Sequence, residues 1–413
     1  MQHPLETTQW CSEGAADIAK RAVLKRLADA DPRLWLQGDL LSATDTFPAT
    51  ATRLINAGVD KELLLLAAAD KEHAAAGRWL VEEHGATGIK AMASGDGSKR
   101  SVCDVGKVSS DTDVRDFFNS LGSYLGRYIL SEAQYRSPSC EVFFGTDFKD
   151  NDRRVAVKKL TYKQAQQHFE RELKAREHVK DLDCVVQAVA AHVPDGLDVS
   201  GLGDLTRGEP TAAGEFCIVM DLAGANLKNT IDNNQLLAGN NEMWVQMTLK
   251  DIASGLEQIH AAGLVHCDSK LRNWIRITAG GREVFKAIDF DAAVQQGEVI
   301  GDKLFTGFCP PEVACALLEP GSPIAADTSF DAWSFGVIAF RRMTNSDLQV
   351  IATMDGDDNL EDAALRRLCD WNMLPKREQV RVLATAPPLQ RRKAQDLLQR
   401  CLQRDPSQRL TAQ

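Results

Sequence analysis

Apolar residues recur at every third or fourth position through much of the first hundred residues. The stretches 15–28 and 63–84 combine this spacing with abundant Ala, Leu, Glu, Lys and Arg, which is typical of amphipathic helices. Residues 94–113 are rich in Ser, Gly and Asp and predict a loop or linker, and a short helix follows over 114–121. We therefore expect a helical part that ends near residue 110 and begins with a helical segment over 1–37.

Two of these helical stretches resemble each other. Residues 40–58 and 64–85 each predict a helix, a second helix and a capping glycine, Gly58 in the first and Gly85 in the second. The second stretch is similar to an ankyrin repeat, although the spacing is shorter than the usual period of about 33 residues and Thr-Pro-Leu-His is missing. A plain helical bundle is the alternative. In either case we expect residues 38–110 to serve packing or protein interaction, because we find no catalytic constellation in them.

Beyond residue 121 the pattern changes to the alternation and β-branched content of strands. Strands are predicted over 128–130, 140–146 and 153–160, with a turn at 150–152 that joins the last two as a hairpin. An amphipathic helix follows over 161–178, and the later part of the chain is mostly helical. This order predicts an α+β domain after the helical part.

Composition and charge exclude several classes of protein. The 413 residues are 44% apolar and 26% charged, as in an ordinary globular protein. The 48 Lys and Arg against 58 Asp and Glu give a formal charge of −10, so the chain lacks the basic field that nucleic-acid binding uses. The longest apolar run, 63–69, is far shorter than the roughly 20 residues of a membrane helix, and residues 1–21 lack a signal-peptide pattern. We therefore expect a cytoplasmic protein without a nucleic-acid partner or a membrane segment.

The ten cysteines are scattered along the chain, without a Cys-x-x-Cys pair or a Cys/His cluster at zinc-ligand spacing. The chain is also long enough for two or three domains whose hydrophobic cores are stable without disulfides. The sequence therefore predicts reduced core cysteines.

A lysine on a predicted strand is the first candidate for chemistry. In Val155-Ala156-Val157-Lys158 the period of two places Ala156 and Lys158 on one face of the strand. The next helix carries Glu172 within its apolar stripe, where its carboxylate could pair with the buried ammonium of Lys158. The alternative is two solvated charges that do not meet.

A second candidate lies at a predicted hairpin with strands over 274–278 and 284–288. With the last residue of the first strand facing the first residue of the second, Asn273 lies directly opposite Asp289. Opposed residues have Cα atoms about 4.5–5.5 Å apart, and Asp268 precedes Asn273 by only five residues. A few converging oxygen ligands suit Mg²⁺, whereas each aspartate taken singly is a common turn former.

Taken together, the motifs follow one order along the chain. They are Val-Ala-Val-Lys at 155–158, Glu172, His-x-Asp-x-Lys-x-x-Asn at 266–273, Asp-Phe at 289–290, Pro-Pro-Glu at 310–312, Asp-Ala-Trp-Ser-Phe-Gly at 331–336, and Arg409. This order resembles the eukaryotic protein kinase catalytic domain over residues 121–413. The resemblance implies an α+β, two-lobed protein kinase fold, with a small lobe over 121–221 and a large lobe over 222–413, preceded by an all-α ankyrin-like repeat region.

The resemblance also implies roles for single residues in phosphate transfer from ATP. Lys158 would hold the α- and β-phosphates, and Glu172 would orient Lys158. Asp268 would accept the proton of a serine or threonine hydroxyl of a protein substrate, while Lys270 would lie near the γ-phosphate. A lysine two residues after the catalytic aspartate is similar to serine/threonine kinases rather than to tyrosine kinases.

Further roles concern the metal, the adenine and the architecture. Asn273 and Asp289 would bind Mg²⁺, and Asp331 would brace the catalytic loop. Glu312 and Arg409 would form an ion pair in the large lobe. The residues around the adenine would be Ala156, Met220 as gatekeeper, and Asp221, Leu222 and Ala223 as the hinge.

One segment and two single residues depart from the family pattern. The phosphate-loop segment 131–142 contains no glycine, which makes a close approach of its backbone to phosphate harder. The metal motif reads Asp289-Phe290-Asp291, where the family usually ends in glycine. Cys267 replaces the arginine before Asp268, and this removes a cation that pairs with a phosphorylated activation loop, so such phosphorylation should matter less.

Two functions follow from these observations. One is an active ATP- and Mg²⁺-dependent serine/threonine kinase of the tyrosine-kinase-like group, similar to its oomycete members, whose repeats bind a protein partner. The other is a pseudokinase scaffold with weak or no phosphotransfer. Because the family continues into a final helix after the position of Arg409, we also expect a shortened large lobe.

Overall fold

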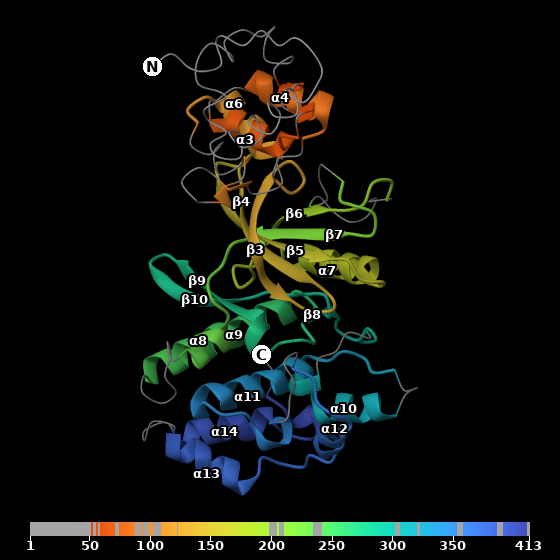
Figure 1. Cartoon of the computed structure of the whole chain (residues 1–413). Coiled ribbons are helices and arrows are strands. Elements are labelled where there is room, and N and C mark those ends of the chain that lie inside the picture. The colour runs from red at the N-terminus through yellow and green to blue at the C-terminus, as the bar shows by residue number, and fades with distance from the viewer. Residues whose placement is uncertain are drawn as a thin grey trace, which may run out of the picture. The chain divides into compact units, whose positions relative to one another are not determined.

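The structure, a computed structural model shown in Figure 1, covers residues 51–410 except 53–54, 57, 71–73, 87–91, 94–98, 101, 103–108, 122, 198–204, 206–209, 234–241, 302–305, 320–322, 353–357 and 386–390. The predicted helical segment 1–37 and the start of the predicted repeats, 38–50, lie outside the described residues. Two compact units are present, the first with the residues up to Ser131 and Gly145–Arg154, the second with Glu132–Phe144 and everything from Val155. None of the helices in the described ranges has both the length and the apolar content to cross a membrane.

The first unit is built around one hydrophobic core. Its helices are α3 (Lys61–Asp70), α4 (Ala74–His84) and α6 (Thr112–Leu121). Leu65, Leu80 and Phe118 are fully buried within this core. The runs of Leu and Ala have high helix propensity, and their packing against α6 supplies the stability that short helices lack on their own.

The end of α4 follows the prediction of a capping glycine. Gly85 has a φ of +60°, and its N–H donates to the carbonyl of Val81 at 3.0 Å while Ala86 N–H donates to that of Leu80 at 3.1 Å. A short hairpin, β1 (Met92–Ala93) with β2 (Lys99–Arg100), differs from the all-α expectation for this region. The ankyrin-like character of the region stays a prediction.

The small lobe contains a five-stranded sheet in the order β3-β4-β5-β7-β6 (Figure 1). The strands are β3 (Tyr128–Arg136), β4 (Glu141–Asp147), β5 (Arg153–Leu160), β6 (Ala188–His192) and β7 (Phe216–Asp221). The helix α7 (Ala165–Val179) packs against β7, and Phe169 and Ile218 are fully buried in their shared core. This packing aligns the polar residues of α7 with those of β5.

The strand β3 is longer than predicted, because it includes the first half of the glycine-free segment 131–142. Without glycine the backbone stays extended to Arg136 and turns at once into β4. The Ser137 hydroxyl accepts hydrogen bonds from the N–H groups of Ser139, at 3.3 Å, and Cys140, at 3.1 Å, which stabilises this turn.

The large lobe is mainly helical (Figure 1). Almost every residue of its helix α11 (Thr328–Thr344) is buried. Its helices are α8 (Leu227–Asp232), α9 (Glu242–Ala261), α10 (Pro311–Leu318), α11 (Thr328–Thr344), α12 (Asp362–Cys369), α13 (Lys376–Thr385) and α14 (Arg391–Cys401). Short 3-10 turns are η2 (Leu271–Asn273), η3 (Thr306–Phe308), η4 (Gln349–Ile351) and η5 (Pro406–Gln408), and β8 (Leu264–Val265) pairs with β11 (Val294–Gln295). The sequence of α11 is apolar around most of its circumference, which is typical of a helix at the centre of a core.

The predicted hairpin is present, but its predicted register is wrong by one residue. The strands β9 (Trp274–Ala279) and β10 (Arg282–Ala287) pair Thr278 with Glu283 rather than with Val284. The connection is a two-residue turn in which Gly280 and Gly281 have φ values of +56° and +76°. At the turn, the first strand is one residue longer than predicted and the second strand begins two residues earlier. This difference shifts the partner of Asn273 from Asp289 to Ile288, whose N–H donates to the Asn273 carbonyl at 3.0 Å.

The prediction of reduced cysteines is wrong for two of them. Cys315 at the end of α10 and Cys369 at the end of α12 form a disulfide, with Cα atoms 4.9 Å apart. The two residues are 54 positions apart, so spacing along the chain could not reveal their pairing. By contrast, Cys184 and Cys401 are buried and form no disulfide.

Candidate active site

Lys158 lies at the centre of a buried cluster of carboxylates. Its Nζ donates to Glu172 Oε2 at 2.8 Å, to Asp291 Oδ2 at 3.3 Å and to Asp289 Oδ1. Burial alone would lower the pKa of Lys158, but the charges of Asp289, Asp291 and Glu172 outweigh it and raise the pKa well above its usual value. The expected Lys158–Glu172 ion pair is therefore present, and the alternative of two separate solvated charges is excluded.

Glu172 is held from its other side by Arg176, one turn later on α7. Arg176 Nε donates to Glu172 Oε1 at 2.9 Å, and its terminal nitrogens reach the Val186 carbonyl at 3.0 Å and the Met220 sulfur at 3.1 Å. Burial raises the pKa of Glu172, but the Lys158 and Arg176 cations outweigh it, so the pKa lies below its usual value. We did not predict Arg176 from the sequence, although its spacing of four residues from Glu172 on a helix was the available clue.

The predicted adenine-side residues lie along the pairing of β5 with β7. Ala156 pairs with Met220, and Val155 pairs with Asp221. Met220 is buried, and Ala223 packs at the edge of the same core. The structure thus brings the small side chain of Ala156 next to the start of the segment that links the two lobes.

Asp268, Lys270 and Asn273 converge in the loop that leads into η2. Lys270 Nζ lies 3.0 Å from Asp268 Oδ2, and Asn273 Nδ2 donates to the same oxygen at 2.9 Å and to the Asp268 carbonyl at 2.8 Å. Burial raises the pKa of Asp268 to about 6, against the opposing attraction of Lys270. Because the amide nitrogen of Asn273 is used by Asp268, its amide oxygen is the atom left to face a cation.

The backbone of this loop is fixed by a buried aspartate of α11. Asp331 accepts hydrogen bonds from the N–H groups of His266, at 2.8 Å, and Cys267, at 3.0 Å, and contacts His260 Nε2 at 2.8 Å. Cys267 has a φ of +61°, an unfavourable conformation for a side chain with a Cβ, and these bonds help to hold it. Burial raises the pKa of Asp331, but the hydrogen bond and charge from His260 outweigh it and leave the pKa below its usual value.

Asp289 belongs to the site, but it does not lie directly opposite Asn273 as the predicted register requires. It follows β10 by two residues and has a φ of +66°, which turns the chain away from the hairpin. Its carboxylate contacts Lys158 instead of lying directly opposite Asn273. The residue two positions later, Asp291, is fully buried and points its Oδ2 to the same ammonium.

Three of these acidic groups form a candidate cation site. Single carboxylate oxygens of Glu172, Asp289 and Asp291 all lie within 4.8 Å of one another. Such hard oxygen donors fit Mg²⁺ better than a soft metal, although all three carboxylates also accept from the Lys158 ammonium. Asn273, the other predicted ligand, contacts Asp268 and does not belong to this group of carboxylates. The donor set therefore fits the metal that the sequence predicts, with Asp291 as an additional carboxylate.

The expected ion pair of the large lobe is also present. Arg409 donates in bidentate geometry to Glu312, at 2.6 and 2.7 Å, and the Arg409 side chain is completely buried. It ties the start of α10 to the chain after α14.

The buried lysine–glutamate pair of the small lobe and the braced Asp-x-Lys-x-x-Asn loop of the large lobe are the arrangement typical of a two-lobed protein kinase domain. Residues 140–413 match the family described as "Protein kinase domain", and the chain belongs to this family. Members of the family use ATP and Mg²⁺ in general.

Similar proteins of known name are serine/threonine kinases or kinase subunits. The inhibitor of nuclear factor kappa-B kinase subunit alpha of Gallus gallus is 26% identical over 195 residues, 46% of this chain and 24% of its own length. The subunit beta of Mus musculus is 30% identical over 158 residues, 38% of this chain and 19% of its own length. The serine/threonine-protein kinase ULK3 of Homo sapiens is 27% identical over 202 residues, 48% of this chain and 36% of its own length. The chain thus spans only a fifth to about a third of each of these relatives.

Proposed function

We propose that this protein is a serine/threonine kinase that transfers the γ-phosphate of ATP to hydroxyls of protein substrates. The observation that carries the proposal is the convergence of one buried cluster, Lys158 with Glu172 and Asp289, and one catalytic-type loop, Asp268 with Lys270. These residues come from β5, α7, the segment after β10 and the loop before η2, so only the folded chain brings them together.

In this proposal Lys158 binds the α- and β-phosphates, and Glu172, fixed by Arg176, keeps its ammonium in place. Asn273 and Asp289 would hold Mg²⁺, which supplies positive charge to the phosphates when bound. Ala156, Met220, Asp221 and Ala223 would line the adenine side. The glycine-free turn at Ser137–Cys140 would cover the phosphates in place of a glycine-rich loop, although its N–H groups at Ser139 and Cys140 already donate to the Ser137 hydroxyl.

Asp268 is the group that would act on the substrate hydroxyl. Its Oδ2 is engaged by Lys270 and Asn273, while its Oδ1 accepts no hydrogen bond within the described part of the chain. A carboxylate oxygen of this kind can accept the hydroxyl proton and orient the nucleophile. Lys270 would neutralise negative charge on the transferred phosphate.

The direct test is transfer of labelled phosphate from Mg·ATP to a generic protein substrate and to the chain itself. Asp268→Asn and Asp289→Asn should each reduce transfer by at least about a hundredfold. The matched control is Asp396→Asn, because Asp396 is exposed on α14. Transfer that survives both site variants would contradict the proposal.

A pseudokinase is the second candidate, and one observation favours it. Three carboxylates surround Lys158, and the third, Asp291, occupies the position where the family usually has glycine. Extra negative charge there opposes the binding of phosphate. For an active kinase, Asp291→Gly should lower transfer because the present residue belongs to a working site, whereas a large gain in activity would support the scaffold.

We also propose that the helical part before the kinase domain binds a protein partner. Its support is the packed pair α3 and α4 with a separate core, which resembles one repeat of an interaction array. The ankyrin-like assignment, the cytoplasmic location, the tyrosine-kinase-like group and the domain limits 38–110 and 121–413 stay predictions. A pull-down with the full chain and with Leu80→Asp, which disrupts this core, would test whether a partner depends on it.

A further inference from the structure

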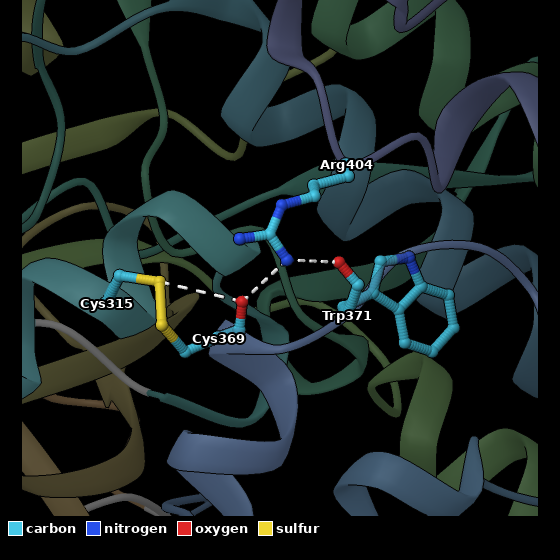
Figure 2. Close-up of a disulfide and its surroundings, with 4 residues drawn as sticks. All are labelled: Cys315, Cys369, Trp371 and Arg404. Atoms are coloured by element: carbon cyan, nitrogen blue, oxygen red, sulfur yellow. Dashed lines mark hydrogen bonds between the residues drawn. A yellow bond between two sulfur atoms is a disulfide. The ribbon is translucent and has the colours of Figure 1, made fainter.

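The disulfide between Cys315 and Cys369 joins two helices of the large lobe (Figure 2). The helices α10 and α12 pack closely, and the disulfide links the last turn of one to the last residue of the other. Both cysteines are partly exposed, so a small thiol in solution can reach the bond. Nothing in the proposed phosphotransfer uses this pair.

Noncovalent bonds connect the same two helices by a second route. Arg404 donates to the carbonyls of Cys369, at 2.9 Å, and Trp371, at 2.6 Å (Figure 2). Arg409 donates to the Arg404 carbonyl at 3.0 Å and to the carboxylate of Glu312 on α10. The disulfide therefore closes a ring that runs from α10 through Arg409 and Arg404 to α12 and back.

The chain just before α12 is hydrogen-bonded to η3 and forms an ion pair with η2, and η2 belongs to the candidate active site. Leu360 N–H donates to Thr306 Oγ1 at 2.6 Å, and Gly307 N–H donates to the Asp358 carbonyl at 2.9 Å, so both bonds fix η3. Asp358 also pairs with Arg272 of η2, with a distance of 3.1 Å between Nε and Oδ2. Arg272 lies between Lys270 and Asn273 in sequence. A displacement of α12 that moves Asp358 would therefore also move the loop that carries Lys270 and Asn273.

We propose that Cys315 and Cys369 form a reversible redox brace that holds α12, and through it η3 and η2, in the geometry needed for protein substrates. In the oxidised state the covalent bond completes the ring, and in the reduced state only packing and the Arg404 contacts remain. Reduction should therefore loosen η3 without unfolding the lobe.

The chemistry is thiol–disulfide exchange. For closure, one cysteine thiolate attacks glutathione disulfide and releases one glutathione thiolate, and the second cysteine then displaces the other glutathione. The two cysteines lose two electrons and two protons, which the two glutathione thiols carry away. A dithiol reverses the reaction and becomes a cyclic disulfide itself.

Exposure distinguishes this pair from several free thiols nearby. Burial raises the pKa of Cys184 to about 11 and that of Cys309 and Cys401 to about 12, so these thiols hardly form thiolate at neutral pH. Cys184 thus provides a matched control, because it is buried in the same hydrophobic core as residues of α10 and α12 but cannot readily exchange.

The first experiment measures amide hydrogen exchange by mass spectrometry on the full chain, oxidised with glutathione disulfide or reduced with dithiothreitol. Peptide mapping without reductant must first show the Cys315–Cys369 link after oxidation. Reduction should then speed exchange of the Gly307 and Leu360 amides by about tenfold. The double variant Cys315→Ser/Cys369→Ser should behave as reduced under both conditions, and Cys184→Ala should respond as the wild type does.

A missing link after oxidation, or equal exchange of these amides in both states, would overturn the brace. These readouts do not depend on catalysis. The functional arm rests on the proposed kinase activity: reduction should raise KM for a protein substrate at least threefold while KM for ATP stays within twofold. If no phosphate is transferred in either state, the proposed function fails while the exchange data still decide the brace. If transfer occurs with unchanged KM, the link from the brace to substrate binding is wrong.

Discussion

At the scale of single residues, burial decides the chemistry of Asp268. Burial raises its pKa to about 6, although Lys270 lowers it in part, so the carboxylate is ionised at pH 7 and protonated as the pH falls below 6. Only the ionised form can accept the hydroxyl proton. We therefore predict that kcat/KM is constant near pH 7.5 and falls about tenfold per pH unit below 6.

The measurement is the pH profile of kcat/KM for a peptide substrate between pH 4.5 and 8, with circular dichroism at each pH as a control for unfolding. Activity that stays constant down to pH 4.5 in folded protein would show that Asp268 has an ordinary carboxyl pKa or is not the base.

Arg176 is a positioning residue rather than a catalytic one. Its guanidinium is buried and bonded to Glu172, Val186 and Met220. Arg176→Met therefore leaves Lys158 as the one cation in the described part of the chain that pairs with Glu172. Loss of one partner of a buried ion pair typically costs about 3–5 kcal/mol. We predict a loss of about 3 kcal/mol in urea unfolding and a raised KM for ATP.

Lys180→Met is the matched control, because Lys180 pairs with Glu177 on the exposed side of the same region and its loss should cost less than about 0.5 kcal/mol. Equal effects of the two variants would contradict the role given to Arg176.

At the scale of elements, local pattern was informative where packing agrees with it. The period of two in β5 and the apolar stripe of α7 indicated the pair of Lys158 with Glu172, which the structure contains, but left two solvated charges as the alternative. The hairpin of β9 and β10 was also predictable, but its register depends on how tightly Gly280 and Gly281 turn, and a difference of one residue moves Asp289 away from Asn273. Turn geometry, rather than hydrophobic pattern, was the missing information.

The packing of α4 against α6 gives a prediction for the first unit. A Cβ added to Gly77 would lie 2.7 Å from the Phe117 ring and 2.8 Å from the buried Phe118 ring. Helix propensity alone favours Ala over Gly by about 1 kcal/mol, whereas overpacking a core costs about 1–3 kcal/mol. Because Phe118 has no exposed side on which to move, we predict that Gly77→Ala lowers the melting temperature of this unit.

The control is Ala75→Gly at an exposed position of the same helix, which should destabilise by propensity alone, about 1 kcal/mol. A stabilised Gly77→Ala variant would show that the two aromatic rings can move aside.

At the scale of the whole molecule, two features join distant parts of the chain, and composition and periodicity revealed neither of them. The Cys315–Cys369 disulfide connects positions 54 residues apart, and Asp331 bonds to the backbone of His266 and Cys267 more than sixty residues away. Family resemblance implied the second of these contacts, but no family pattern implied the first. Such contacts depend on tertiary packing, which composition and periodicity do not specify.

The described residues also contain separate hydrophobic cores, one in the first unit and others in the kinase lobes. Cores that share no buried residue can melt independently. We therefore predict two transitions in differential scanning calorimetry. ADP with Mg²⁺ at about a hundred times its Kd should stabilise the kinase fold by about 2.7 kcal/mol, which raises its melting temperature by roughly 5 °C.

The second transition should not respond to the nucleotide, and Gly77→Ala should lower that transition alone, which assigns it to the first unit. Asp289→Asn should abolish the nucleotide shift, because it removes the proposed ligand of Mg²⁺ and a partner of Lys158. A single cooperative transition that shifts as a whole with ADP would instead show that the two cores are energetically coupled, so that a partner bound to the helical part could alter nucleotide binding in the kinase domain.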